Sequence, residues 1–326
     1  MTRSTAGASA SVSASVHVPA SLKAMLAHSI DYAGVFPPAA LETDAAARNY
    51  ARYRDDRAAG WLLGRFVCAA SKLNEVLRWL PQVTTPGKPL PIIAIGRPGA
   101  DANELTRGLR LDLECVRAFR QQAGRRARVE GFEMRLPGDV AGAQRVVKEI
   151  ARAAKLGMRP FCEVPVGPDF ASNVGEFVAL IATNPEIGAK LRCGGADPSA
   201  VPSSEQVAAM IVACRDARVP LKFTGGLHHA IRGTEPTSGA KAHGFINVFI
   251  AAVIARVGAR TAADLLPILD DENAADFKFL DYAISWQTVK ATTAQVTAVR
   301  RDDVIAFGSC SFDEPREELR KLGWVS

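Results

Sequence analysis

Several charged side chains lie inside short segments that are otherwise apolar. They are the two glutamates and two lysines Glu133, Glu163, Lys190 and Lys222. Burying a charge without a partner is costly, so each of these side chains needs a counter-ion or a chemical task. Lys190 and Lys222 are roughly 30 residues apart, about one strand–helix–strand unit, so we expect them on neighbouring strands about 4.8 Å apart. Burial and mutual repulsion both lower a lysine pKa, and a neutral amine attacks a carbonyl carbon to form a Schiff base.

The neighbours of the two lysines differ, and the difference predicts which of them is the nucleophile. Arg192 lies two residues after Lys190, and its fixed positive charge should lower the pKa of Lys190 further. Lys222 is followed on its face by Thr224, a neutral hydroxyl, and stands beside a glycine pair that suits an anion. We therefore predict that Lys190 is the neutral nucleophile and Lys222 a retained cation, while the two glutamates move protons. A second interpretation stays open, in which the lysines and glutamates form an ion network that only supports the fold.

The elements that must position these residues alternate between short apolar runs and longer amphipathic stretches. Eight runs of four to nine residues are typical of strands buried on both faces. They are Ile30–Phe36, Arg65–Ala70, Pro91–Gly96, Gly131–Leu136, Pro160–Pro165, Ala189–Gly194, Pro220–Gly225 and Val304–Phe312. Helical patterns lie between them, including one that opens with Ser203 and Gln206 at capping-box spacing. This alternation predicts an α/β fold with a parallel sheet, and eight strands favour a closed (β/α)8 TIM barrel.

An open α/β sheet stays an alternative, although the chain has neither a G-x-G-x-x-G nor a G-x-x-x-x-G-K-[ST] phosphate loop. In a barrel, charged residues near the carboxyl ends of strands line the active site. About 75 residues separate the last two expected strands, so we predict an insertion at about 227–303, near the barrel's carboxyl end or at an oligomer surface. We predict that the chain consists of a disordered tail at 1–24, which is rich in Ser and Ala, and one barrel domain at 25–326.

Histidines follow the seventh expected strand. His228 and His229 come just after the glycine pair, where loops can place imidazoles over a substrate as acids, bases or ligands. A metal-dependent lyase or hydrolase that uses Glu163 and His243 is therefore an alternative function. No H-E-x-x-H or similar ligand spacing supports it, so we predict neither a metal nor another cofactor.

The last three expected strands resemble those of deoxyribose-phosphate aldolases. The matching motifs are Lys190-Leu-Arg-Cys-Gly, Lys222-Phe-Thr-Gly-Gly-Leu and Phe307-Gly-Ser-Cys-Ser. The resemblance implies that Lys190 forms the Schiff base, that Lys222 activates it, and that backbone and hydroxyl groups bind a phosphate. The implied phosphate positions are Gly225, Gly226, Gly308 and Ser309. Arg192 stands where the family has a small hydroxyl residue, and the family's proton-transferring aspartate has no clear counterpart. The segments 221–229 and 243–247 also resemble an uncharacterised bacterial barrel family.

The predicted function is that of a lyase or isomerase acting on a small anionic carbonyl compound, through an aldolase-type Schiff base. The predicted catalytic residues are Lys190, Lys222, Glu163 and Glu133. The predicted substrate-binding residues are Arg192, Arg135, Thr224, Gly225, Gly226, His228, His229, Gly308 and Ser309. A non-catalytic barrel that binds a metabolite in the same basic pocket remains a further alternative.

The composition of the chain indicates which classes of molecule it binds. The net charge of +6 comes without a run of basic residues, which excludes a nucleic-acid surface and suits a small anionic metabolite. Six separate cysteines without C-x-x-C spacing predict reduced thiols and a cytoplasmic location, with Cys193 and Cys310 as buried, unreactive groups. The chain has no secretory signal and no apolar run of about 18 residues, so we expect no membrane. The apolar segment Phe245–Val257 suits the core or the face of a homo-oligomer, which we expect.

Overall fold

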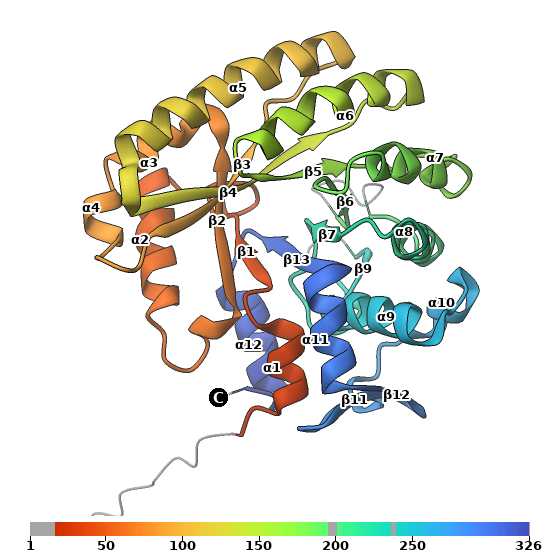
Figure 1. Ribbon diagram of the computed structural model, residues 1–326. Helices are drawn as coiled ribbons and strands as arrows, with labels where there is room; N and C mark the ends of the chain where they lie inside the picture. Colours follow the sequence, from red (N-terminus) through yellow and green to blue (C-terminus); the bar gives the residue numbers. More distant parts are fainter. Residues whose placement is uncertain (1–16, 195–200, 236–238, 326) are drawn as a thin grey trace, which may run out of the picture.

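Eight parallel strands close into a barrel in the computed structural model, which describes residues 17–194, 201–235 and 239–325 (Figure 1). The barrel strands are β1 (Ile30–Tyr32), β2 (Leu63–Ala69), β3 (Leu90–Ile95), β4 (Ala127–Arg135), β5 (Arg159–Glu163), β6 (Gly188–Arg192), β7 (Leu221–Thr224) and β13 (Val304–Ser309). Neighbours follow chain order from β1 to β7, and β13 pairs with both β7 and β1 to close the ring. Each expected apolar run forms one of these strands. The predicted (β/α)8 barrel is therefore confirmed, and the open-sheet alternative is wrong.

Helices surround the barrel and cover its outer face (Figure 1). The α-helices are α1 (Ala20–Leu26), α2 (Thr43–Arg54), α3 (Leu73–Leu77), α4 (Leu80–Val83), α5 (Ala102–Ala123), α6 (Val140–Lys155), α7 (Phe170–Ala182), α8 (Ser204–Ala217), α9 (Phe245–Gly258), α10 (Ala262–Asp270), α11 (Thr293–Asp302) and α12 (Asp313–Lys321). Short 3₁₀ turns lie at Gly60–Leu62, Ala70–Lys72, Gly124–Arg126 and Ala274–Asp276. The predicted cap of α8 is confirmed, since Ser203 Oγ accepts the Gln206 N–H and Gln206 Oε1 accepts the Ser203 N–H.

The long segment between β7 and β13 contains part of the barrel's own wall. It holds a two-stranded sheet of β8 (Gly233–Thr234) and β9 (Lys241–Ala242), the helices α9 to α11, and an antiparallel sheet of β10 (Phe277–Phe279), β11 (Ala283–Trp286) and β12 (Val289–Thr292). The helix α9 is buried against the barrel strands. The ring centroid of Phe249 lies 6.4 Å from that of Phe223 in β7 and 5.8 Å from that of Phe307 in β13. Phe245, one turn earlier, stacks on Phe307 at 5.0 Å. This part of the insertion is therefore barrel core and not an addition at the carboxyl end or a free oligomer face.

The beginning of the chain differs in part from the expectation. Most of the predicted tail, residues 1–16, lies outside the described residues. Residues 20–24 belong to α1, whose Leu22, Met25 and Leu26 are buried in the core. In Figure 1, α1 lies beside α11. In the described part of the chain, none of the helices has the length and apolar character needed to cross a membrane.

The aromatic cluster on α9 makes a prediction about stability. We expect Phe249→Ala to lower the free energy of unfolding by about 3–5 kcal/mol, because the truncation leaves a cavity between β7, β13 and α9. Urea unfolding followed by circular dichroism measures the change. Leu111→Ala, at a side chain that is 45% exposed, is the control and should stay within about 0.5 kcal/mol of the parent. Equal effects of the two substitutions would contradict the assignment of α9 to the core.

Candidate active site

The barrel register brings together the charged side chains that the sequence singled out. Glu163 of β5 pairs with Lys190 of β6, and Lys190 pairs with Lys222 of β7, so the three residues lie at one level on neighbouring strands. Side chains at paired positions point to the same face of a sheet, here the barrel interior. Glu133 of β4 and Asp31 of β1 reach the same group of charges from the other strands. We call these five residues the interior ion network.

Lys190 lies between two carboxylates. Its Nζ is 2.8 Å from Glu133 Oε2 and 2.9 Å from Glu163 Oε2. Lys222 also has two carboxylate partners, since its Nζ is 2.6 Å from Asp31 Oδ2 and contacts Glu133 Oε1. Each oxygen of Glu133 therefore serves a different lysine, and this one side chain joins the two halves of the network.

Burial differs along the network. Lys222 and Asp31 are each 1% exposed, whereas Lys190 is 6% and Glu163 9% exposed. Lys222 also lies over the ring of Phe161, with its Nζ 5.9 Å from the ring centroid. The accessible end of the network is therefore the pair Lys190–Glu163, and the end formed by Lys222 and Asp31 lies deeper.

Glu133 and Lys190 are held in the ionised form by their partners in the network. Burial opposes the charge on Glu133, but the ammonium groups of Lys190 and Lys222 outweigh it and lower the pKa of Glu133 from 4.5 to about 2. Burial likewise opposes the charge on Lys190, but Glu133 and Glu163 outweigh it and raise its pKa well above its ordinary value of 10.5. The prediction that Lys190 is a neutral amine in the free protein is therefore wrong. The repulsion between the lysines is offset by the carboxylates placed between and beside them.

Two arginines lie at the carboxyl ends of the strands that carry the network. Arg135 is the last residue of β4 and Arg192 the last residue of β6. Each lies two positions beyond a network residue, so each shares that residue's inward face, and each is exposed. Arg192 Nε donates to Gly194 O at 2.7 Å. Within residues 17–194, 201–235 and 239–325, neither arginine forms an ion pair with a carboxylate.

The predicted glycines allow close backbone approach at the ends of β6 and β7. Gly225 and Gly226 have φ values of +66° and +68°, the left-handed region that favours glycine. A Cβ on Gly226 would lie 2.9 Å from Cys193 O, so the two strand ends meet only because this side chain is absent. Gly308 pairs with both Asp31 and Thr224, and a Cβ there would lie 2.7 Å from Thr224 Oγ1. These contacts account for the glycines by packing, and their binding of phosphate stays a prediction.

The remaining predicted binding residues have protein partners. Ser309 is buried, and its Oγ accepts the Ser311 N–H at 3.3 Å. His228 Nδ1 is 2.5 Å from Glu314 Oε2. His229 Nε2 is 3.2 Å from Glu235 Oε2. The two adjacent histidines therefore have different carboxylate partners.

His243 is a structural residue, which removes the basis for the metal-dependent alternative. It is fully buried, its Nε2 is 2.7 Å from Pro202 O, and its Nδ1 is 3.2 Å from Arg232 Nη1. Both ring nitrogens are thus occupied, and burial lowers the pKa of His243, which keeps the ring neutral. In the part of the chain that the structure describes, no group of three or more His, Cys, Asp or Glu side chains is arranged to hold a metal ion.

Asp31 is the network residue that the sequence analysis did not select as functional. It stands between Ile30 and Tyr32 in a buried strand, the same pattern that identified the other charged residues. Its second oxygen is satisfied as well, since Asp31 Oδ1 accepts the backbone N–H of Arg65 at 2.7 Å.

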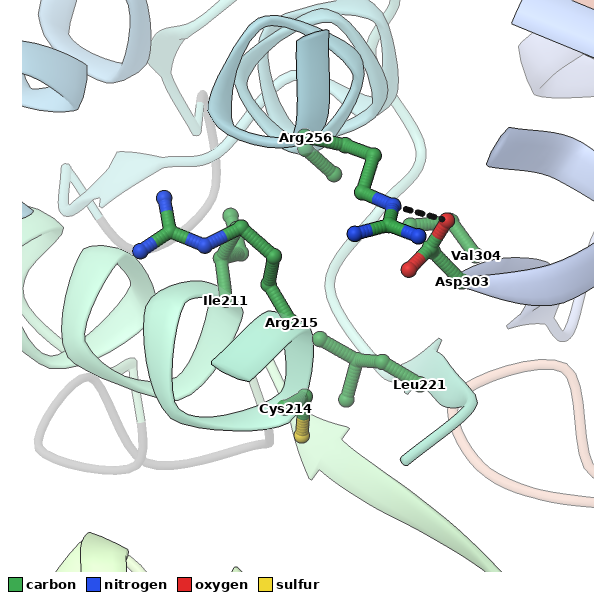
Figure 2. A pocket seen from close by; sticks show the side chains of 8 residues that line it. Ile211, Cys214, Arg215, Leu221, Arg256, Asp303 and Val304 are labelled. Carbon is green, nitrogen blue, oxygen red and sulfur yellow. Dashed lines mark ion pairs between the residues drawn. The ribbon is translucent and has the colours of Figure 1, made fainter. Parts of the chain in front are cut away.

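A small cavity lies away from the network, at the amino ends of β7 and β13. Figure 2 shows it between α8 and α9, where Arg256 and Asp303 form an ion pair of 3.5 Å. Leu221 and Val304, the first residues of β7 and β13, line it. Its volume of about 10 Å³ is the space of at most one water molecule, so it is no substrate site.

Three solved structures resemble the chain at low sequence identity. No family model matches the chain, and no curated protein matches it. Among solved structures, a tetrameric deoxyribose phosphate aldolase from Aeropyrum pernix has 13% identity and a TM-score of 0.42, covering 75% of this chain and 90% of the aldolase. The catalytic domain of a chitinase from Pyrococcus furiosus has 15% identity and a TM-score of 0.38, covering 74% of this chain and 92% of that domain.

An endoglucanase from Humicola insolens has 11% identity and a TM-score of 0.34, covering 60% of this chain and 72% of the endoglucanase.

The bridging position of Glu133 predicts a large effect of its loss. We expect Glu133→Gln to lower the free energy of unfolding by about 3–5 kcal/mol, because two buried ammonium groups lose their shared carboxylate partner. Glu130→Gln, at a half-buried surface partner of Arg65, is the control and should cost at most about 1 kcal/mol.

The lowered pKa of Glu133 predicts that the stability of the protein depends on pH. The folded-state pKa of Glu133 is below its unfolded value, so its stabilisation is present above pH 4.5 and is lost as the pH falls toward about 2. Urea midpoints measured across this window should fall less steeply in Glu133→Gln than in the parent. Parallel curves for the two proteins would contradict the lowered pKa.

Proposed function

We propose that this chain is an aldolase-type lyase that breaks or forms a carbon–carbon bond in a small anionic carbonyl compound, through an imine on Lys190. One observation carries the proposal: Lys190 lies between two carboxylates at the accessible end of the interior ion network. Arg135 and Arg192 lie beyond it at the strand ends, without carboxylate partners among the described residues. A reactive amine, proton carriers and an anion site are thus combined on one face of the barrel.

Imine formation requires that Lys190 first loses a proton. Glu163 is the proposed acceptor, because its Oε2 is 2.9 Å from Lys190 Nζ and it is the most exposed carboxylate of the network. Transfer of the proton turns a buried ion pair into a neutral amine and a neutral acid, which burial favours over the separated charges. A substrate carbonyl that enters beside Lys190 displaces water and strengthens this effect. Lys190 therefore becomes a nucleophile on substrate binding.

The reaction then follows the chemistry of a Schiff base. The Lys190 nitrogen attacks the carbonyl carbon, the oxygen takes a proton from Glu163, and loss of water leaves an iminium ion. The iminium nitrogen accepts the electron pair of the cleaved carbon–carbon bond, while a carboxylate of the network takes the proton of the substrate hydroxyl. The cleavage releases one carbonyl product and leaves an enamine on Lys190. The carboxylic acid that formed in the cleavage step returns its proton to the enamine carbon, and hydrolysis of the resulting imine releases the second product and the amine. Glu133 is the less suitable base, because both of its oxygens are bound to lysines.

Lys222 has an electrostatic role in this scheme. Asp31 and Glu133 hold its ammonium group at the buried end of the network. Its positive charge keeps Glu133 ionised, and Glu133 in turn orients Lys190. The predicted division of roles between the two lysines is retained, although the reason is the arrangement of carboxylates and not the charge of Arg192.

A non-catalytic, metabolite-binding barrel is the second candidate. The observation that favours it is that every charge of the network already has a partner within salt-bridge distance. In that case the network supports the barrel, and only the two arginines contact a ligand. The expected homo-oligomeric state and cytoplasmic location stay predictions.

Borohydride trapping separates the two candidates. The protein is incubated with short aldehydes and keto acids, reduced, and mapped by peptide mass spectrometry. We expect a reduced adduct on Lys190 that is absent from Lys190→Arg and present in Lys278→Arg, a control at an exposed position. An adduct only on Lys222 would reverse the roles of the lysines. A compound that raises the melting temperature but gives no adduct would support the binding protein and contradict the lyase.

A further inference from the structure

A second set of chemically complementary side chains lies at the carboxyl end of the barrel. Cys310 follows β13 directly, His228 lies in the loop after β7, and Glu314 is in the first turn of α12. His228 Nε2 is 3.8 Å from Cys310 Sγ, and His228 Nδ1 is 2.5 Å from Glu314 Oε2. None of the three belongs to the interior ion network. They form a chain of thiol, imidazole and carboxylate.

The carboxylate determines where the imidazole carries its proton. An ionised Glu314 only accepts hydrogen bonds, so Nδ1 of His228 must be the donor. In the neutral ring the lone pair then lies on Nε2, which faces the thiol of Cys310. Glu314 thus orients the ring and stabilises the imidazolium that forms when Nε2 takes a proton.

The surroundings of Cys310 keep the thiol protonated at rest and place a base beside it. Burial raises the pKa of Cys310, so the resting thiol keeps its proton and depends on a base. The backbone N–H of Ala39 donates to the sulfur, which favours the thiolate once it forms. Among the cysteines of the described residues, Cys310 is the one with a histidine within hydrogen-bond distance, and it is 9% exposed.

We propose that Cys310 is a second nucleophile of this protein, which accepts a small acyl group with His228 as its general base. In the proposed step the thiol proton moves to His228 Nε2 while the sulfur attacks the acyl carbon, and the carbonyl π electrons move to oxygen. The tetrahedral intermediate collapses, the leaving alkoxide departs with the bonding pair, and it takes the proton from Nε2. The products are a thioester on Cys310 and an alcohol. Glu314 is a positioning residue.

Acetylation by p-nitrophenyl acetate tests the proposal on the full chain. Nitrophenolate release gives the rate, and peptide mass spectrometry locates the acetyl group. Cys115 on α5 is more exposed than Cys310 and provides an internal comparison. Exposure alone predicts that Cys115 reacts first, whereas the proposal predicts Cys310. Cys115→Ser is the control variant and should leave the rate at Cys310 unchanged.

Variants of the base distinguish catalysis from a structural effect. We expect His228→Asn to slow acetylation of Cys310 by about 100-fold, and imidazole added to the solution to restore part of the rate. Glu314→Asp, which keeps the carboxylate, should lose less than Glu314→Gln, which keeps the shape. Glu314 is exposed, so these two variants should fold even if His228→Asn does not.

Two results would overturn the proposal. The first is acetylation of Cys115 or of lysines in preference to Cys310. The second is a rate at Cys310 that none of the His228 and Glu314 variants changes. Because no residue of the interior ion network takes part, either result leaves the proposed imine on Lys190 untouched.

Discussion

The charges inside the barrel must neutralise one another, because no single one of them would be stable there alone. Three carboxylates and two ammonium groups meet within 3 Å contacts, and Glu133 takes part on both sides. Without the carboxylates, the two ammonium groups would repel each other. Without the lysines, the buried carboxylates would be protonated. Asp31 reaches Lys222 from β1 across the intervening strand β13, where it pairs with Gly308.

The fold was predictable to a large extent, because strands buried on both faces leave a clear apolar signal. All eight barrel strands were expected, with boundaries that differ by a few residues. The long segment before β13 was harder to interpret. An apolar helix suits a core or an interface equally well in sequence, and only the contacts of Phe249 with Phe223 and Phe307 place α9 in the barrel wall.

Four of the five residues of the interior ion network were predicted from the sequence, but their charge states were not. Glu133, Glu163, Lys190 and Lys222 were identified because charges in apolar strands need a reason. Their pKa values depend on which groups touch across the barrel, and a strand pattern does not give this. The neighbour Arg192 suggested a neutral Lys190, whereas the contacts with Glu133 and Glu163 keep it charged. Asp31 and the partners of His228 come from distant parts of the chain, and no local motif connects them.

The charge state of Lys190 tests this account most directly. In protein with ¹⁵N-labelled lysine side chains, the Nζ resonance of Lys190, assigned by its absence in Lys190→Arg, reports ammonium or amine. We predict an ammonium signal in the free protein that persists above pH 10.5 and is replaced when a carbonyl compound forms the imine. A neutral amine at neutral pH in the free protein would contradict the network as the source of the lysine's charge.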